Sequence, residues 1–136
     1  MVNLIVNGQK VQAETGTMLL EAIRSAGVEV PTLCNMDGLT PYGGCRMCSV
    51  ELCRNGRSWV TTSCNYPVEE GLEVVTESAR ALATRQMMAE LLLARCPNVP
   101  SVQRLAASVG VTGTAFGAEN EDEDCVLCPR CVRVCQ

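Results

Sequence analysis

The feature that most constrains this chain is its cysteine content. Ten cysteines occur in 136 residues, whereas average usage would supply about one or two. Disulfides, zinc sites and iron-sulfur clusters compete to explain such a number. The first residues, Met1 to Ile5, lack the charged leader and long apolar run of an export signal, so we expect a cytoplasmic protein with reduced thiols. In a reducing compartment, clustered cysteines are more often metal ligands than disulfides.

The first cysteine set has the spacing of a [2Fe-2S] site. Its members are separated by ten, two and fifteen residues, and they are Cys34, Cys45, Cys48 and Cys64. A C-x2-C pair on a tight loop can present two thiolates to one cluster, and two more cysteines complete the ligand set. Gly43 and Gly44 let the backbone approach inorganic sulfides and donate N–H groups to them. Zinc ribbons usually contain two C-x2-C pairs, so the spacing favours iron-sulfur over zinc.

The second cysteine set lies at the end of the sequence. Its spacing of two, two and three residues is that of bacterial ferredoxins, and its members are Cys125, Cys128, Cys131 and Cys135. In such runs the first three thiolates bind one [4Fe-4S] cluster and the fourth binds a neighbouring cluster. Gln136 replaces the usual proline. The missing ligand is then a cysteine beyond the present end, a partner subunit or Cys96, and a zinc site is the alternative to a cluster.

Two arginines lie within this second set. Arg130 and Arg133 are interpreted in two equally weighted ways. They are either solvated surface charges, or cations that raise the potential of the adjacent cluster or dock an acidic partner.

Alternating apolar residues and two Asn-Gly pairs predict two hairpins. One covers residues 2–13 around Asn7-Gly8, and the other covers residues 48–61 around Asn55-Gly56. Asn-Gly between alternating runs is typical of a type I′ turn.

A helix and a loop connect these hairpins. Thr17 is expected to cap a helix that ends at Gly27, because its apolar residues recur with helical spacing. Residues 31–44 are rich in turn formers and should form a loop, and a third extended piece covers residues 72–76. We therefore expect an α+β fold in which residues 1–77 form a [2Fe-2S] ferredoxin domain resembling a β-grasp domain.

Two further helices are predicted after this domain. The first begins at Ser78 and ends at Arg95, with an apolar face formed by Met88, Leu91 and Leu92. The second has Pro100 in its first turn and ends at Gly110. The rest of the chain is thus organised as a helical hairpin, an acidic linker and an incomplete bacterial-ferredoxin-like [4Fe-4S] segment, over residues 78–111, 112–124 and 125–136.

Three short segments carry a resemblance to a known family. They are residues 31–34 (PTLC), 44–51 (GCRMCSVE) and 62–68 (TSCNYPV). The chain resembles the amino-terminal ferredoxin domain of the large iron-sulfur subunit of respiratory complex I. The same domain occurs in NAD-linked hydrogenases and formate dehydrogenases.

The resemblance also implies that one cluster of the complex I subunit is missing from this chain. In complex I, the helix matching residues 91–93 leads to a histidine and three cysteines that bind an additional cluster. Here that place has Cys96-Pro97, and the next cysteine is Cys125, so this extra cluster should be missing. Cys96 is then expected to be a buried thiol at a helix end, and Cys53 is expected to have no ligand role either.

The composition excludes several classes of site and partner. The chain has no histidine, which excludes Rieske centres, imidazole-bound zinc and catalysis by a histidine base. Its formal charge of −4 argues against nucleic acid as a partner, and no apolar stretch reaches the ~20 residues that span a bilayer. No catalytic residue is evident. We therefore expect an electron-transfer component rather than a complete enzyme.

The resemblance suggests what such a module would connect. It implies single-electron relay between a flavin or NAD(P)H-linked subunit and a catalytic redox subunit. The implied partners are an NADH-binding flavoprotein, a hydrogenase, a formate dehydrogenase or a heterodisulfide-reductase-like subunit. Two alternatives are the amino-terminal part of a catalytic formate dehydrogenase or iron hydrogenase, and a zinc-stabilised interaction domain.

Overall fold

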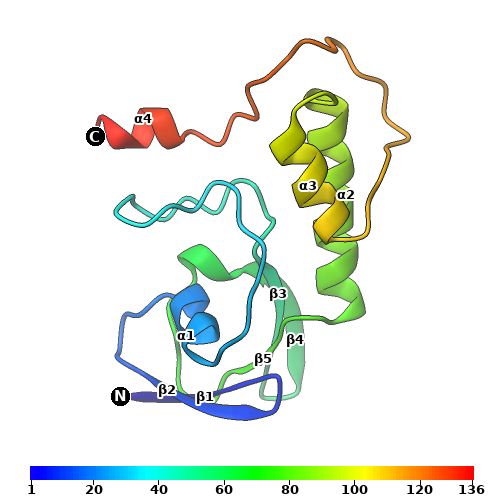
Figure 1. The fold of residues 1–136 in the computed structure, drawn as a ribbon. Helices are drawn as coiled ribbons and strands as arrows, with labels where there is room; N and C mark the ends of the chain where they lie inside the picture. The colour runs from blue at the N-terminus through cyan, green and yellow to red at the C-terminus, as the bar shows by residue number, and fades with distance from the viewer.

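A five-stranded mixed sheet with the strand order β2-β1-β5-β3-β4 forms the base of the molecule (Figure 1). The computed structural model describes all residues from 1 to 136. The strands are β1 (Val2–Val6), β2 (Gln9–Ala13), β3 (Ser49–Arg54), β4 (Arg57–Thr62) and β5 (Glu73–Val75). The helices are α1 (Leu19–Ser25), the 3-10 helix η1 (Ser63–Asn65), α2 (Ala79–Arg95), α3 (Pro100–Ser108) and α4 (Arg130–Val134).

Both predicted hairpins are confirmed. Asn7 and Gly8 have φ angles of 49° and 84°, and Asn55 and Gly56 have φ angles of 51° and 75°. These positive angles are those of the two central residues of a type I′ turn. Strand β5 joins the hairpins into one sheet, because it pairs parallel to β1 and antiparallel to β3.

Helix α1 packs against this sheet and closes the larger of two hydrophobic cores. The inward side chains of α1 are Leu19, Leu20, Ala22 and Ile23, and they meet buried residues of β1, β3 and β5. Strand residues such as Leu4, Val50 and Val74 are at most 2% exposed. Burial of this apolar surface is the main stabilisation of the amino-terminal part.

The prediction that Thr17 caps α1 is wrong. The residue at the cap position is Met18, and no side chain caps the helix. Instead, the backbone of Thr17 accepts a hydrogen bond from Val68 N at 2.9 Å, and Leu19 N donates to Tyr66 O at 2.8 Å. A neighbouring extended segment therefore holds the start of α1 through backbone hydrogen bonds, including one from the otherwise unpaired N–H of the first helical residue.

A second, smaller core lies between the helical hairpin of α2 and α3 and the C-x2-C loop, which contributes Met47. Its buried members are Met47, Ala89, Leu93, Cys96, Val102, Ala106 and Val111. The apolar face predicted for α2 is only partly correct, because Met88 and Leu92 are half-buried and Leu91 is 42% exposed. The buried positions of α2 are instead Ala81, Arg85, Ala89 and Leu93. None of the helices is both long and apolar enough to cross a membrane.

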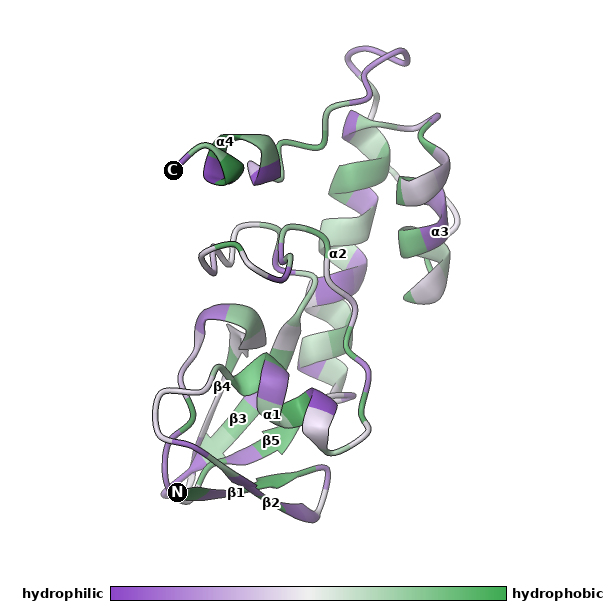
Figure 2. Ribbon diagram, turned by 60° about the vertical axis from the view of Figure 1, so that its left-hand side comes forward, coloured by the Kyte–Doolittle hydropathy of each residue, from purple (hydrophilic) through white to green (hydrophobic).

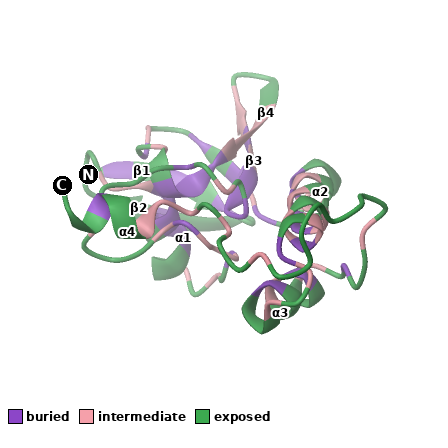
Figure 3. Ribbon diagram, turned by 90° about the horizontal axis from the view of Figure 1, so that it is seen from above, coloured by how far each residue is buried: buried purple, intermediate pink, exposed green.

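The chain after α3 returns toward the sheet domain. Residues 112–129 contain no helix or strand and are mostly exposed (Figure 3). Helix α4 then lies over the long loop between α1 and β3, as both Figure 1 and Figure 2 show. The segment that carries the second cysteine set therefore lies on the same side of the molecule as the loop that carries Cys34.

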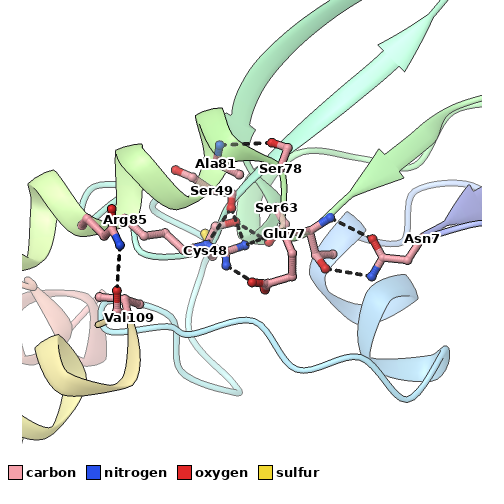
Figure 4. A network of polar contacts seen from close by, with 11 residues as sticks. Asn7, Cys48, Ser49, Ser63, Glu77, Ser78, Ala81, Arg85 and Val109 are labelled. Atoms are coloured by element: carbon pink, nitrogen blue, oxygen red, sulfur yellow. Dashed lines mark hydrogen bonds and ion pairs between the residues drawn. The ribbon is translucent and has the colours of Figure 1, made fainter. Parts of the chain in front are cut away.

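A buried arginine joins α2 to the sheet domain (Figure 4). Arg85 is 1% exposed, and its Nε and Nη2 donate to Ser49 O at 3.0 and 2.7 Å. Nη2 also donates to Thr76 O at 2.6 Å, and Nη1 forms an ion pair with Glu77 at 3.1 Å. Because Ser49 follows Cys48 directly, this arginine anchors the backbone beside a predicted ligand.

We expect Arg85→Met to destabilise the folded chain by about 2–4 kcal/mol, since it leaves two buried carbonyl groups without their donor. Urea unfolding of the metal-free protein, followed by circular dichroism, measures this loss. Arg80→Met is the matched control on the same helix, because Arg80 binds Glu51 from an exposed position. A loss no greater than that of the control would show that Arg85 is not an anchor.

Candidate metal centre

The four cysteines of the first set come from three neighbouring segments. Cys34 and Cys45 lie on the loop between α1 and β3, Cys48 immediately precedes β3, and Cys64 lies in η1. Cys34, Cys48 and Cys64 are at most 2% exposed, and Cys45 is half-buried. The loop therefore encloses the thiols instead of presenting them to solvent.

Hydrogen bonds place these cysteines in two pairs. Cys34 N donates to Cys45 Sγ at 3.4 Å. The thiol of Cys64 lies within hydrogen-bonding reach of Cys48, which lowers the pKa of Cys48 to about 6 and raises the pKa of Cys64. The two sulfurs are thus close enough to share one proton. Thiolates are the form in which cysteine binds metal.

Two glycines shape the loop around the sulfurs. Gly43 has a φ of 71°, and a methyl group added there would lie 2.5 Å from Nδ2 of Asn65. The same addition at Gly44 would clash with the ring of Tyr42. The N–H of Gly43 donates to Cys64, which favours the thiolate form of that sulfur. The side chains of Asn65 and Tyr42 thus leave no room for a larger residue at these glycines, and their close approach to inorganic sulfides stays a prediction.

Two serines that the sequence analysis did not single out hold the C-x2-C loop in place. Ser63 Oγ donates to Cys48 O at 2.8 Å, and Ser49 Oγ donates to Arg46 O at 2.6 Å. Each serine directly neighbours a predicted ligand in sequence, which is the only signal that sequence reasoning could have used. Such hydrogen bonds orient ligands around a metal centre.

The paired arrangement suits a cluster with two irons. Each iron of a [2Fe-2S] cluster takes two protein sulfurs. A structural zinc ion needs four ligands around one point. The donor set and its two-by-two pairing therefore fit the binuclear cluster.

The second cysteine set is more open. Cys125, Cys131 and Cys135 are exposed, and Cys128 is half-buried. Cys131 lies in α4, Cys135 follows its last residue, and the other two precede it on irregular chain. All four are free cysteines, and no hydrogen bond joins their side chains.

Arg130 and Arg133 are neither solvated charges nor turned toward an outside partner. Arg130 donates to Asn35 O at 3.1 Å and also to Leu33 O. Arg133 donates to Thr40 O at 2.9 Å and also to Cys34 O. Both side chains therefore reach from α4 to the loop that carries Cys34.

The two cysteines outside the motifs lie apart from the paired sulfurs. Cys53 is in β3, opposite Ser58 and Glu73 on the adjacent strands. Cys96 ends α2 with no exposed surface, and burial raises the pKa of its thiol. These positions are consistent with the structural role expected for both residues.

Comparison with known proteins decides the family. Residues 1–79 match the family described as the 2Fe-2S iron-sulfur cluster binding domain. The chain belongs to this family. The resemblance found in the sequence is thereby confirmed.

Two curated relatives illustrate the likeness. NADPH-Fe(3+) oxidoreductase subunit alpha of Geobacter sulfurreducens is 30% identical over 157 residues, which cover 98% of this chain and 18% of the relative. The mitochondrial NADH-ubiquinone oxidoreductase 78 kDa subunit of Candida albicans is 38% identical over 96 residues, covering 71% of this chain and 13% of the relative. The chain thus spans less than a fifth of the length of either relative.

A solved structure extends the likeness beyond the matched domain. The structure titled as NAD+-reducing [NiFe]-hydrogenase in the H2-reduced state aligns with a TM-score of 0.82 at 27% identity. The alignment covers 97% of this chain and 64% of that one. The mixed α/β arrangement of sheet and helices is therefore shared with a chain of that hydrogenase.

For a 2Fe-2S domain of this kind, we expect Gly43→Ala to reduce cluster occupancy severely. Alanine at a positive φ costs about 1–2 kcal/mol, and its methyl group would also push Asn65 away from the loop. Iron and acid-labile sulfide content after reconstitution measures the effect. Gly113→Ala is the control, because an added methyl group there meets open space. Equal cluster content in both variants would contradict the proposed role of the loop.

Proposed function

We propose that this chain is an iron-sulfur electron-transfer module that relays single electrons between an NAD(P)H-linked flavoprotein and a catalytic redox subunit. The observation that carries the proposal is the pairing of four enclosed cysteines, Cys34 with Cys45 and Cys48 with Cys64. A bound [2Fe-2S] cluster would supply reversible one-electron chemistry. No general base or nucleophile is needed for that task.

In this proposal each cysteine pair holds one iron. Cys34 and Cys45 bind the first, and Cys48 and Cys64 bind the second. The N–H of Gly43 offsets negative charge on the Cys64 sulfur, while the hydroxyls of Ser49 and Ser63 keep the loop rigid. Rigid ligands favour fast electron transfer because little has to move when the charge changes.

We propose the following domain organisation. Residues 1–77 form a β-grasp [2Fe-2S] domain, residues 78–111 form a helical hairpin, and residues 112–124 are an acidic linker. Residues 125–136 carry the [4Fe-4S] motif, in which Cys125, Cys128 and Cys131 bind one cluster and Cys135 binds a neighbouring cluster or completes the set. The bacterial-ferredoxin spacing and the position of α4 beside the [2Fe-2S] loop support this arrangement.

The names of the relatives support the proposed partners. One relative is a subunit of an NADPH-Fe(3+) oxidoreductase, another of NADH-ubiquinone oxidoreductase, and the aligned structure is an NAD+-reducing hydrogenase. All three names join a nicotinamide nucleotide to a redox acceptor or donor. We infer that this chain occupies the same place between a nicotinamide-linked subunit and a second redox subunit, in a reducing, cytoplasmic setting.

Anaerobic reconstitution of the 136-residue chain with iron and sulfide tests the proposal. We expect visible absorption, acid-labile sulfide, and an electron paramagnetic resonance signal of a [2Fe-2S] cluster after reduction. The control is a variant with serine at positions 34, 45, 48 and 64. A colourless protein that binds zinc in stoichiometric amount, with no sulfide, would overturn the proposal in favour of a zinc-stabilised domain.

A further inference from the structure

Arg133 is a buried cation without an anionic partner. Only 9% of the residue is exposed, and no ion pair in the chain includes it or Arg130. Its guanidinium binds two carbonyl oxygens, those of Cys34 and Thr40, and lies 5.5 Å from the centre of the Tyr42 ring. The Nε atoms of both arginines are buried and have no hydrogen-bond partner.

The positive charge of a buried guanidinium such as that of Arg133 requires a compensating negative group. Burying an unpaired charge is costly, and buried charges in proteins are normally paired or bound to metal centres. Arg85 shows the usual solution within this same chain, because its buried guanidinium forms an ion pair with Glu77. Carbonyl dipoles and an aromatic ring compensate Arg133 only in part.

The loop that Arg133 contacts supplies a suitable anion once it holds a cluster. Four thiolates and two sulfides give the [2Fe-2S] cluster a net negative charge, and one-electron reduction adds one more negative charge. Arg133 donates to the carbonyl of Cys34, which is itself a proposed ligand. Arg130 binds the carbonyls on either side of Cys34, those of Leu33 and Asn35.

We propose that Arg133, assisted by Arg130, provides the positive counter-charge of the [2Fe-2S] cluster and raises its reduction potential. The inference rests on the proposed function, and it assigns these arginines to the cluster of the other cysteine motif, not to their own. The carboxy-terminal motif thereby tunes the amino-terminal cluster. Because the reduced cluster is the more negative form, a nearby cation stabilises reduced over oxidised.

The test is a redox titration of the reconstituted full chain, in which the electron paramagnetic resonance signal of the reduced [2Fe-2S] cluster is followed. Arg133→Met removes the charge at similar length. We expect it to lower the equilibrium constant for one-electron reduction about tenfold, which is a shift of about 59 mV toward negative potential. Arg133→Lys keeps the charge and should recover most of the shift. Arg104→Met, on the exposed side of α3, is the matched control and should change nothing.

The outcomes separate this inference from the proposed function. A chain that binds no [2Fe-2S] cluster defeats the proposed function itself. If the chain binds the cluster but the Arg133→Met and Arg104→Met variants have the same potential, only the proposed counter-charge role of Arg133 is overturned. Equal shifts in the Met and Lys variants would also overturn it, since they would trace the effect to packing. If circular dichroism shows that Arg133→Met folds poorly, the potential is measured in Arg130→Met instead. We expect that variant to shift the potential in the same direction by a smaller amount.

Discussion

Cys64→Ser is expected to abolish the [2Fe-2S] signal completely. Cys64 is the sulfur partner of Cys48 and is only 2% exposed, so solvent has little access to the position that its sulfur occupies. Serine keeps the size of the side chain, but its hydroxyl does not ionise in the range in which a thiol does and binds iron poorly. The remaining pair, Cys34 and Cys45, would hold only one of the two irons.

The measurement is electron paramagnetic resonance of the reduced variant, together with iron and sulfide analysis. Cys53→Ser is the matched control, because Cys53 lies between Ser58 and Glu73 in the sheet and away from the paired sulfurs. We expect the control to retain the full signal. An intact cluster in Cys64→Ser, with loss in Cys53→Ser, would transfer the fourth ligand to Cys53.

Exposure of the reconstituted chain to air is expected to remove the carboxy-terminal cluster first. Three of its four cysteines are exposed, whereas Cys34, Cys48 and Cys64 of the other site are buried. Oxygen and chelators therefore reach one cluster directly and the other only after the loop opens. We expect a three-iron form to precede full loss of the [4Fe-4S] cluster, while the [2Fe-2S] signal persists.

Cys128→Ser tests whether the carboxy-terminal cysteines bind a cluster separate from the [2Fe-2S] site. This variant should lack the four-iron contribution from the start and keep its [2Fe-2S] cluster, whereas Cys96→Ala should keep both. Iron content and spectra recorded before and after exposure to air give the comparison. Simultaneous loss of both clusters, or loss of the four-iron cluster in Cys96→Ala, would contradict the separate roles assigned to the two motifs.

Features that depend only on residues adjacent in the sequence were predicted correctly. The two Asn-Gly turns form as predicted, because a type I′ turn depends only on the residues within it. Ser78 begins α2 and its Oγ accepts a hydrogen bond from Ala81 N at 3.1 Å, as an N-cap does. The spacing also selected four cysteines that the fold brings close together, Cys34 beside Cys45 and Cys48 beside Cys64.

Local signals failed where a distant segment changed the outcome. Thr17 looked like a cap, but residues 66–68 hold the start of α1 through backbone hydrogen bonds. Leu91 looked like a core residue, but α2 turns its alanines and Arg85 inward against the sheet domain and α3. In both cases a contact with another element decides which groups are used, and the periodicity of a single segment does not show such contacts.

The sequence was enough to predict the turns and the 2Fe-2S character of the domain, because these depend on residue type and short spacing. The relation between the two cysteine motifs could be read only from the folded chain. Arg133 and Cys34 are 99 residues apart, yet one donates to the carbonyl of the other. The sequence singled out Arg133 as a cation beside a cysteine motif, but a buried charge acquires its neighbours through the fold, so the position of α4 over the loop that carries Cys34 could not be predicted from the sequence.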